Sequence, residues 1–186
     1  VYKGALILSD GAFTFDSIRA NNIGITIGID GKNKNYAVDV NAKVASLHEK
    51  KSGQTVNDFK LDLRVAVANG IQVQRIVLND CSLMMYGGTL ALKGSSNFMN
   101  NIDYSLTLRD FTYLKYFNMP LTAKITADLH AKGETPKSVV VDTAIRVTDI
   151  DYRKDAMAVK VPRCELSGTA IIDVDKEFAY VDQMRL

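Results

Sequence analysis

The sequence predicts an all-β protein in which a long antiparallel sheet is built as a meander. Apolar and polar residues alternate along most of the chain, which is the two-residue period of a strand with one solvent-facing side. Residues 121–131 show this best, because every odd position is apolar and every even one is polar. Dipeptides that favour tight turns separate the alternating segments, and a helical period is nearly absent.

The alternating segments predict a series of strands, and the apolar side of each can be named. In chain order these segments are residues 23–29, 36–44, 59–67, 102–108, 121–131, 139–147 and 166–174. Two segments change phase, near Arg75 and at Thr148-Asp149, after which Ile150 and Tyr152 continue the apolar side. A one-residue slip turns the following side chains to the other face, so each phase change predicts a β-bulge or a bend.

The same sequence predicts the positions of turns and of one short helical turn. Five dipeptides predict turns with positive φ: Asp10-Gly11, Asp30-Gly31, Ser52-Gly53, Asn69-Gly70 and Gly87-Gly88. One short helical turn is predicted over residues 110–118, where Phe111, Leu114 and Phe117 recur every three residues and Pro120 stops continuation. Residues 177–186 fit a strand or a helix equally well.

Composition and charge exclude several function classes. The chain has 23 basic and 21 acidic residues, and neither sign forms a long run, so nucleic-acid tails and polybasic membrane patches have no support. No apolar run approaches the roughly 18 residues of a membrane helix, and no signal-type segment opens the chain. Because residue 1 already lies in an apparent strand, we expect residues 1–186 to be a single β segment of a longer repetitive protein.

No constellation of catalytic or metal-binding residues is evident. His48 and His130 are the only histidines, and His130 lies on the polar side of its strand, which predicts a solvent-facing residue. Motifs for hydrolases, zinc sites and nucleotide binding are missing, so we expect neither an enzyme nor a metal or other cofactor. Asp149 and Asp151 lack the rest of a calcium loop. Cys81 and Cys164 fit a disulfide or two unpaired thiols.

The sequence resembles the TamB/AsmA-like repeat proteins of the bacterial envelope. The sequence pattern that carries this resemblance is a series of strand and turn segments, at residues 87–94, 104–111, 113–120, 121–135 followed by Pro136, and 139–149. Residues 1–30 resemble the end of another repeat unit of this kind. The resemblance implies a long curved antiparallel sheet folded into an open groove, the β-taco, with an apolar lining. It also implies a periplasmic protein that bridges two membranes for phospholipid, with a link to outer-membrane assembly and with anchors outside this chain.

Under this interpretation the apolar sides of the strands contact phospholipid or another acyl-chain amphipath. The residues expected to do so are Ile23, Ile25, Ile27, Val38, Val40, Phe59, Leu61, Leu63, Val65, Tyr104, Leu106, Leu108, Leu121, Ile125, Leu129, Val141, Ile145 and Val147. The alternative is a closed β-sandwich that serves as a spacer, adhesin or assembly scaffold, since its core would show the same alternation. In either case an exposed terminal strand would allow self-association through its edge.

Overall fold

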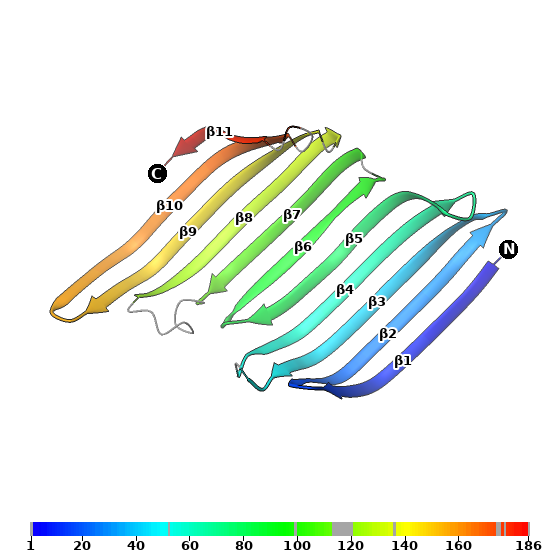
Figure 1. The fold of residues 1–186 in the computed structure, drawn as a ribbon, viewed down its shortest axis with the longest axis horizontal. Helices are drawn as coiled ribbons and strands as arrows, with labels where there is room; N and C mark the ends of the chain where they lie inside the picture. The colour runs from blue at the N-terminus through cyan, green and yellow to red at the C-terminus, as the bar shows by residue number, and fades with distance from the viewer. Residues whose placement is uncertain are drawn as a thin grey trace. The chain divides into compact units, whose positions relative to one another are not determined.

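The computed structural model describes residues 2–51, 53–98, 100–112, 121–135, 137–173, 176 and 178–185. These residues form strands and turns and contain no helix (Figure 1). The strands are β1 Tyr2–Phe15, β2 Ile18–Lys32, β3 Asn35–Glu49, β4 Thr55–Ala68, β5 Gln72–Met85, β6 Gly88–Asn97, β7 Asn100–Phe111, β8 Leu121–Thr135, β9 Ser138–Lys154, β10 Met157–Asp173 and β11 Phe178–Arg185.

The strands form an antiparallel meander that is not closed. Their order in the sheet follows the chain from β1 to β11, and β1 and β11 each have a single neighbour. The predicted all-β class and the open sheet are therefore confirmed. The chain divides into two compact units, unit 1 (Val1–Met84 and Ala91–Asn101) and unit 2 (Met85–Leu90 and Ile102–Leu186).

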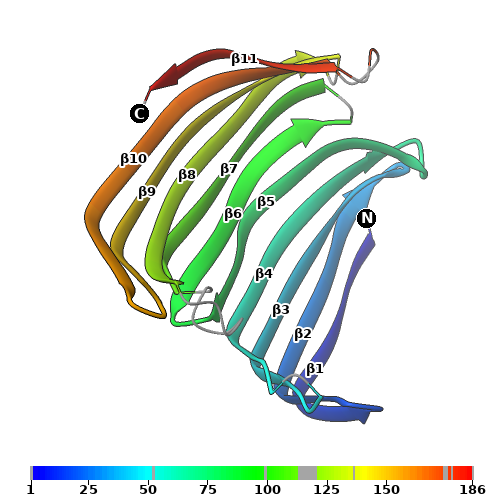
Figure 2. The same ribbon diagram turned by 60° about the vertical axis from the view of Figure 1, so that its left-hand side comes forward.

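Unit 1 contains β1 to β5, which lie side by side in chain order (Figure 2). Ile27 of β2 lies opposite Leu6 of β1 and Val40 of β3, and Val40 in turn lies opposite Leu63 of β4. Residues directly opposite each other in an antiparallel ladder point to the same face. The register therefore aligns the apolar sides of neighbouring strands.

Unit 2 contains β7 to β11 and follows the same rule. Leu129 of β8 lies opposite Leu106 of β7, while Ile145 of β9 lies opposite Ala127 of β8 and Leu166 of β10. The predicted strand over residues 121–131 lies within β8, and the undecided C-terminal segment forms strand β11.

Both predicted phase changes are β-bulges. The ladder between β8 and β9 shifts between Thr122 and Lys124, opposite Asp149, and the ladder between β4 and β5 shifts between Ala66 and Val67, opposite Gln74. Asp149 adopts φ of 54°. Similar left-handed Asp or Asn residues occur at other register shifts, namely Asp10, Asn22, Asp58 and Asp110. Aspartate and asparagine tolerate this conformation better than other non-glycine residues.

Replacing Asp149 by Val should therefore destabilise the protein by about 1–2 kcal/mol, because a β-branched residue is strained in the left-handed region. Asp149→Asn is the matched control, since it removes the ion pair with Lys124 and keeps a residue that accepts positive φ. Urea unfolding followed by circular dichroism measures the difference. Equal stability of the two variants would show that the ion pair, and not the bulge, determines the effect.

Two of the five predicted turns are wrong. Asp10-Gly11 lies inside β1, where Asp10 forms a bulge, and Asp30-Gly31 lies inside β2, while the turn after β2 is made by Asn33 and Lys34 at φ of 52° and 66°. Asn69-Gly70 forms the turn between β4 and β5, as predicted. The same dipeptide chemistry supplies positive φ at a bulge and at a turn, so composition alone does not separate them.

The remaining predicted turns and the helical turn have mixed outcomes. Gly53 has φ of 67° next to β4, and its partner Ser52 lies outside the described residues. Gly87 has φ of 76° and forms the turn together with the preceding residue, Tyr86, whereas Gly88 begins β6. The predicted helical turn lies largely outside the described residues, and its first two residues, Asp110 and Phe111, belong to β7.

The described residues bury very little. The buried hydrophobic residues are Ala20, Ala123 and Ala127, at 1%, 6% and 5% exposure, and no large side chain is fully buried. A closed sandwich interdigitates large side chains from two sheets and removes them from solvent. Many apolar side chains instead remain exposed, with Leu6 at 67% and Phe15 at 72%.

Candidate functional site

The apolar face of unit 1 consists of cross-strand rows that run over up to five strands. Each row follows from the register of consecutive strand pairs. The rows are Gly4, Ile29, Val38, Val65 and Ile76; Leu6, Ile27, Val40, Leu63 and Leu78; Leu8, Ile25, Ala42, Leu61 and Cys81; and Ile23, Val44 and Phe59. None of these residues is charged, so unit 1 presents one continuous apolar surface.

The apolar face of unit 2 is defined in the same way. Its rows are Tyr104, Ala131, Val141, Ala170 and Val181; Leu106, Leu129, Thr143, Gly168 and Met184; Leu108, Ala127, Ile145 and Leu166; Phe111, Ile125, Val147 and Cys164; and Leu121, Tyr152 and Val159. This face also carries no charge. Thr143 and Gly168 make one row less apolar than the rows of unit 1.

All eighteen residues predicted to contact lipid belong to these two faces. Every one of them is half-buried. Their common orientation is a property of the register, and their contact with lipid stays a prediction. The sequence reasoning missed Leu6 and Leu8 of β1 and Ile76 and Leu78 of β5, because the bulges at Asp10 and Gln74 interrupt the alternation that would have revealed them.

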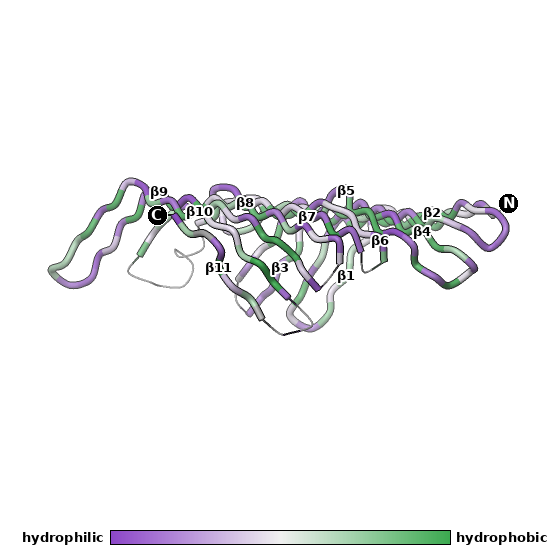
Figure 3. The backbone as a smooth tube through the Cα atoms, turned by 90° about the horizontal axis from the view of Figure 1, so that it is seen from above, coloured by the Kyte–Doolittle hydropathy of each residue, from purple (hydrophilic) through white to green (hydrophobic). Residues whose placement is uncertain are grey.

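The opposite, polar face of each unit carries the charges, and hydropathy alternates along the strands accordingly (Figure 3). In unit 1, Arg64 pairs with Asp39 across β3 and β4 at 3.4 Å. In unit 2, Arg109 pairs with Asp128 across β7 and β8. These side chains are a third or more exposed, so each pair stabilises the fold only modestly. Their main effect is to make the two faces chemically distinct.

Glu165 is the centre of a charge cluster on the polar face of unit 2. Arg146 of the neighbouring strand β9 donates a hydrogen bond to its Oε1 at 2.6 Å, and Arg163 donates to the same oxygen. These two hydrogen bonds lower the pKa of the Glu165 carboxyl. The contribution of the cluster to stability is thus present above the ordinary glutamate pKa and is lost as pH falls through the lowered value.

We expect Glu165→Gln to reduce the stability of the protein slightly at neutral pH. The stability of this variant should also change less than that of the parent chain when the pH is lowered. The difference in stability between the variant and the parent chain should become smaller as pH falls below about 4.3, where a glutamate in the unfolded chain takes up its proton. Thermal unfolding between pH 3 and pH 7 measures this, with Glu134→Gln, an exposed glutamate of β8, as the control. A constant difference across this range would show that the two arginines do not stabilise the carboxylate.

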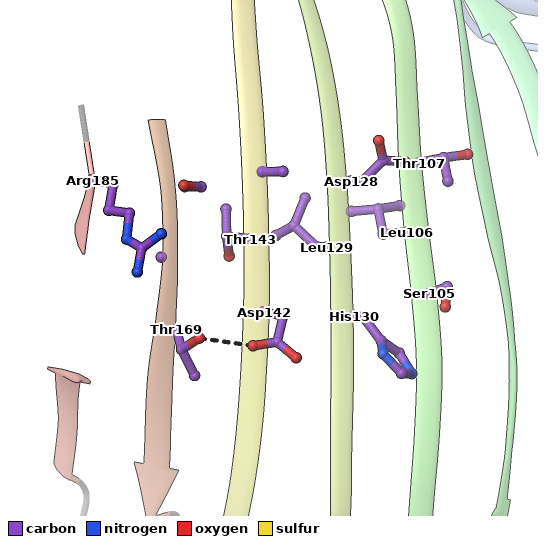
Figure 4. A pocket seen from close by; sticks show the side chains of 13 residues that line it. Ser105, Leu106, Thr107, Asp128, Leu129, His130, Asp142, Thr143, Thr169 and Arg185 are labelled. Atoms are coloured by element: carbon purple, nitrogen blue, oxygen red, sulfur yellow. Dashed lines mark hydrogen bonds between the residues drawn. The ribbon is translucent and has the colours of Figure 1, made fainter. Parts of the chain in front are cut away.

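A shallow hollow of about 560 Å³ lies on the polar face of unit 2 (Figure 4). His130, Asp142, Thr169 and Ser105 line it, and Thr169 donates a hydrogen bond to Asp142 at 2.8 Å. His130 Nε2 lies 2.8 Å from Asp103. The hollow is open. Most of its lining residues belong to the polar rows, and one row of the apolar face, Leu106, Leu129, Thr143 and Gly168, also lines it. The predicted solvent-facing position of His130 agrees with this geometry.

The other candidate residues have simple surroundings. His48 Nδ1 lies 3.0 Å from the hydroxyl of Thr55. Cys81 and Cys164 are both free thiols. Asp151 pairs with Arg153 at 2.8 Å, and a hydrogen bond from Arg153 lowers the Asp151 pKa. The described residues contain no group of three or more potential metal ligands.

Neither a membrane-spanning helix in the described residues nor a similar protein was found for this chain. In the part of the chain that the structure describes, no helix has the length and apolar character needed to cross a membrane. The chain matches no protein-family model, no curated protein and no solved structure.

Proposed function

We propose that the apolar faces of units 1 and 2 contact the acyl chains of phospholipid, and that the chain is a lipid-handling segment of a bridge-like envelope transporter. The observation that carries this proposal is a charge-free apolar face in each unit whose large side chains stay half-exposed. Apolar patches of more than a few hundred Å² are uncommon on soluble monomers and mark interaction surfaces.

Energetics favour a hydrocarbon occupant. Each CH₂ removed from water contributes about 0.8 kcal/mol, so a chain of ~16 carbons represents on the order of 13 kcal/mol before the cost of ordering it. The faces also lack any charged side chain that would bind a phosphate or an amine. We therefore propose that they hold acyl chains and leave head groups in solvent.

The wider role rests on the resemblance to TamB/AsmA-like proteins. By that resemblance we propose a periplasmic location, passive movement of phospholipid along the apolar faces, and an indirect contribution to outer-membrane assembly. Attachment to the membranes would come from segments other than residues 1–186. No nucleotide and no catalytic group is needed for movement by contact alone.

Native mass spectrometry of the chain purified with minimal detergent tests the proposal. We expect co-purified phospholipid. Exchange experiments should then give similar occupancy for lipids with the same acyl chains and with anionic, zwitterionic or uncharged head groups, because the faces carry no charge. A chain that stays lipid-free after incubation with phospholipid vesicles would contradict the proposal and favour a role as a spacer or assembly scaffold.

A further inference from the structure

Three turns of unit 1 lie at the same end of its strands and form a rim. They are the β2–β3 turn, the β4–β5 turn and the β6–β7 turn, and the first two lie side by side in Figures 1 and 2. The Gly70 amide of the second turn donates a hydrogen bond to the Lys34 carbonyl of the first at 2.8 Å. The Phe98 amide of the third turn donates to the Gln74 carbonyl, at the start of β5, at 3.0 Å. These bonds hold the three turns next to one another.

Two large apolar side chains lie at the tips of this rim. Ile71 in the β4–β5 turn is 87% exposed, and Phe98 in the β6–β7 turn is 59% exposed. Both line a hollow of about 560 Å³, so they lie close together. Four residues with side-chain amides line the same hollow, namely Gln72, Gln74, Asn97 and Asn100. The two apolar tips are thus surrounded by uncharged side chains and are open to a partner beyond the ends of the strands.

The charge of this rim is positive. Lys32, Lys34 and Arg75 are exposed, and within the described residues none of them has an ion-pair partner. No Asp or Glu occurs in the segments that contain the turns, which are residues 31–38, 66–78 and 94–102. The first carboxylate along β2, that of Asp30, lies opposite Lys3 in the ladder. Because the cations come from separate parts of the chain, no long run of basic residues marks this surface in the sequence.

The rim at the other end of the unit 1 strands differs in charge. It also exposes a large aromatic residue, Phe15, at 72%. There, however, Lys51 pairs with Asp16 at 3.5 Å, and the Lys51 amide donates a hydrogen bond to the carboxylate of Glu49. The two ends of unit 1 therefore share exposed apolar tips, and they differ in whether carboxylates offset the lysines.

We propose that the rim defined by Lys32, Lys34, Ile71, Arg75 and Phe98, the basic rim, docks on the surface of an anionic lipid bilayer. The three cations lie near anionic head groups, and the two apolar tips enter the boundary between head groups and acyl chains. Basic residues and inserted apolar side chains are the two contributions by which proteins bind such surfaces. Docking places the strand ends of unit 1 at the membrane. It does not rest on the proposed function, because the rim is separate from the apolar faces.

Co-sedimentation with vesicles tests the charge of the partner. The chain should bind vesicles of phosphatidylglycerol and phosphatidylcholine in equal amounts, and bind vesicles of phosphatidylcholine alone at least about tenfold more weakly. One basic residue near an anionic surface strengthens binding about fivefold, so Lys32→Gln with Lys34→Gln should weaken it on the order of 25-fold. Lys50→Gln with Lys51→Gln is the matched control, because it removes the same charge from the other rim and should change binding little.

Fluorescence tests which side chains enter the membrane. The chain contains no tryptophan, so Phe98→Trp places a single fluorophore in the basic rim and Phe15→Trp places one in the other rim. We expect the emission of the first variant to shift to the blue when anionic vesicles are added and that of the second to stay unchanged. Ile71→Ser should weaken vesicle binding roughly tenfold, because an exposed apolar side chain no longer leaves water. Circular dichroism confirms that each variant is folded.

A variant of the apolar face separates docking from lipid uptake. Leu63→Asp should dock on anionic vesicles like the parent chain, whether or not its apolar face holds acyl chains. Equal binding to both kinds of vesicle, equal losses from the two double-lysine variants, or a blue shift at Phe15→Trp without one at Phe98→Trp would each overturn the proposal. A parent chain that does not bind anionic vesicles would also overturn it and would favour an acidic protein as the partner of the basic rim.

Discussion

Replacing Leu63 by Asp should abolish most of the lipid bound to the chain and leave the sheet folded. Leu63 lies in the middle row of the unit 1 apolar face, between Val40 and Leu78, and its side chain is half-buried. In the free protein the new carboxylate can reach water, so the fold loses only cross-strand apolar contacts of about 0.2–1 kcal/mol each. An acyl chain over the same position would desolvate an unpaired charge.

We therefore expect at least about a tenfold loss of bound phospholipid, because a penalty of 1.4 kcal/mol already produces that factor. Val77→Asp is the matched control, since Val77 is a half-buried apolar residue on the polar face, opposite Arg64. Native mass spectrometry gives the lipid occupancy and circular dichroism gives the fold. Unchanged occupancy in a folded Leu63→Asp variant would show that the predicted residues are not the contact surface, and global unfolding would indicate a core position.

Replacing Gly88 by Ala should be the most destabilising single methyl addition in unit 2. Gly88 begins β6, is buried, and lies against the backbone of β7. A Cβ at this position would overlap the carbonyl oxygen of Arg109 and approach the Cα of Phe111 to 2.8 Å. Backbone atoms of a paired strand cannot move aside as a flexible side chain does, so we expect a loss of about 1–3 kcal/mol.

The control is Gly28→Ala in β2, where the nearest atom to the added Cβ, the Asp39 Cβ, lies at 3.9 Å. That variant should be neutral or slightly more stable, because glycine in a strand interior costs roughly 0.5–1 kcal/mol relative to alanine. Chemical unfolding of the two variants and the parent measures the contrast. Equal stability of all three proteins would mean that β6 and β7 separate easily at Gly88.

The orientation of side chains followed from the sequence because a strand has a period of two. The apolar positions of residues 36–44, 59–67 and 121–131 needed only this period to be assigned to one face, and the register agrees. The phase changes at Arg75 and Asp149 were also readable, since a bulge inverts the period at a definite residue. A strand was expected at residue 1, but the apolar side and the length of β1 were not assigned, because its bulge at Asp10 carries the same Asp-Gly pair as a turn.

The sequence by itself determined the class of the fold, the order of strands in a meander and the absence of charge on one side of each strand. Those features depend on local periodicity and on short-range turn chemistry, which each segment carries alone. Only the tertiary structure decided whether the apolar sides would be closed into a core or left half-exposed, and how neighbouring apolar rows are aligned. Both outcomes depend on which strands pair and in which register, and alternation is the same in a closed and an open sheet.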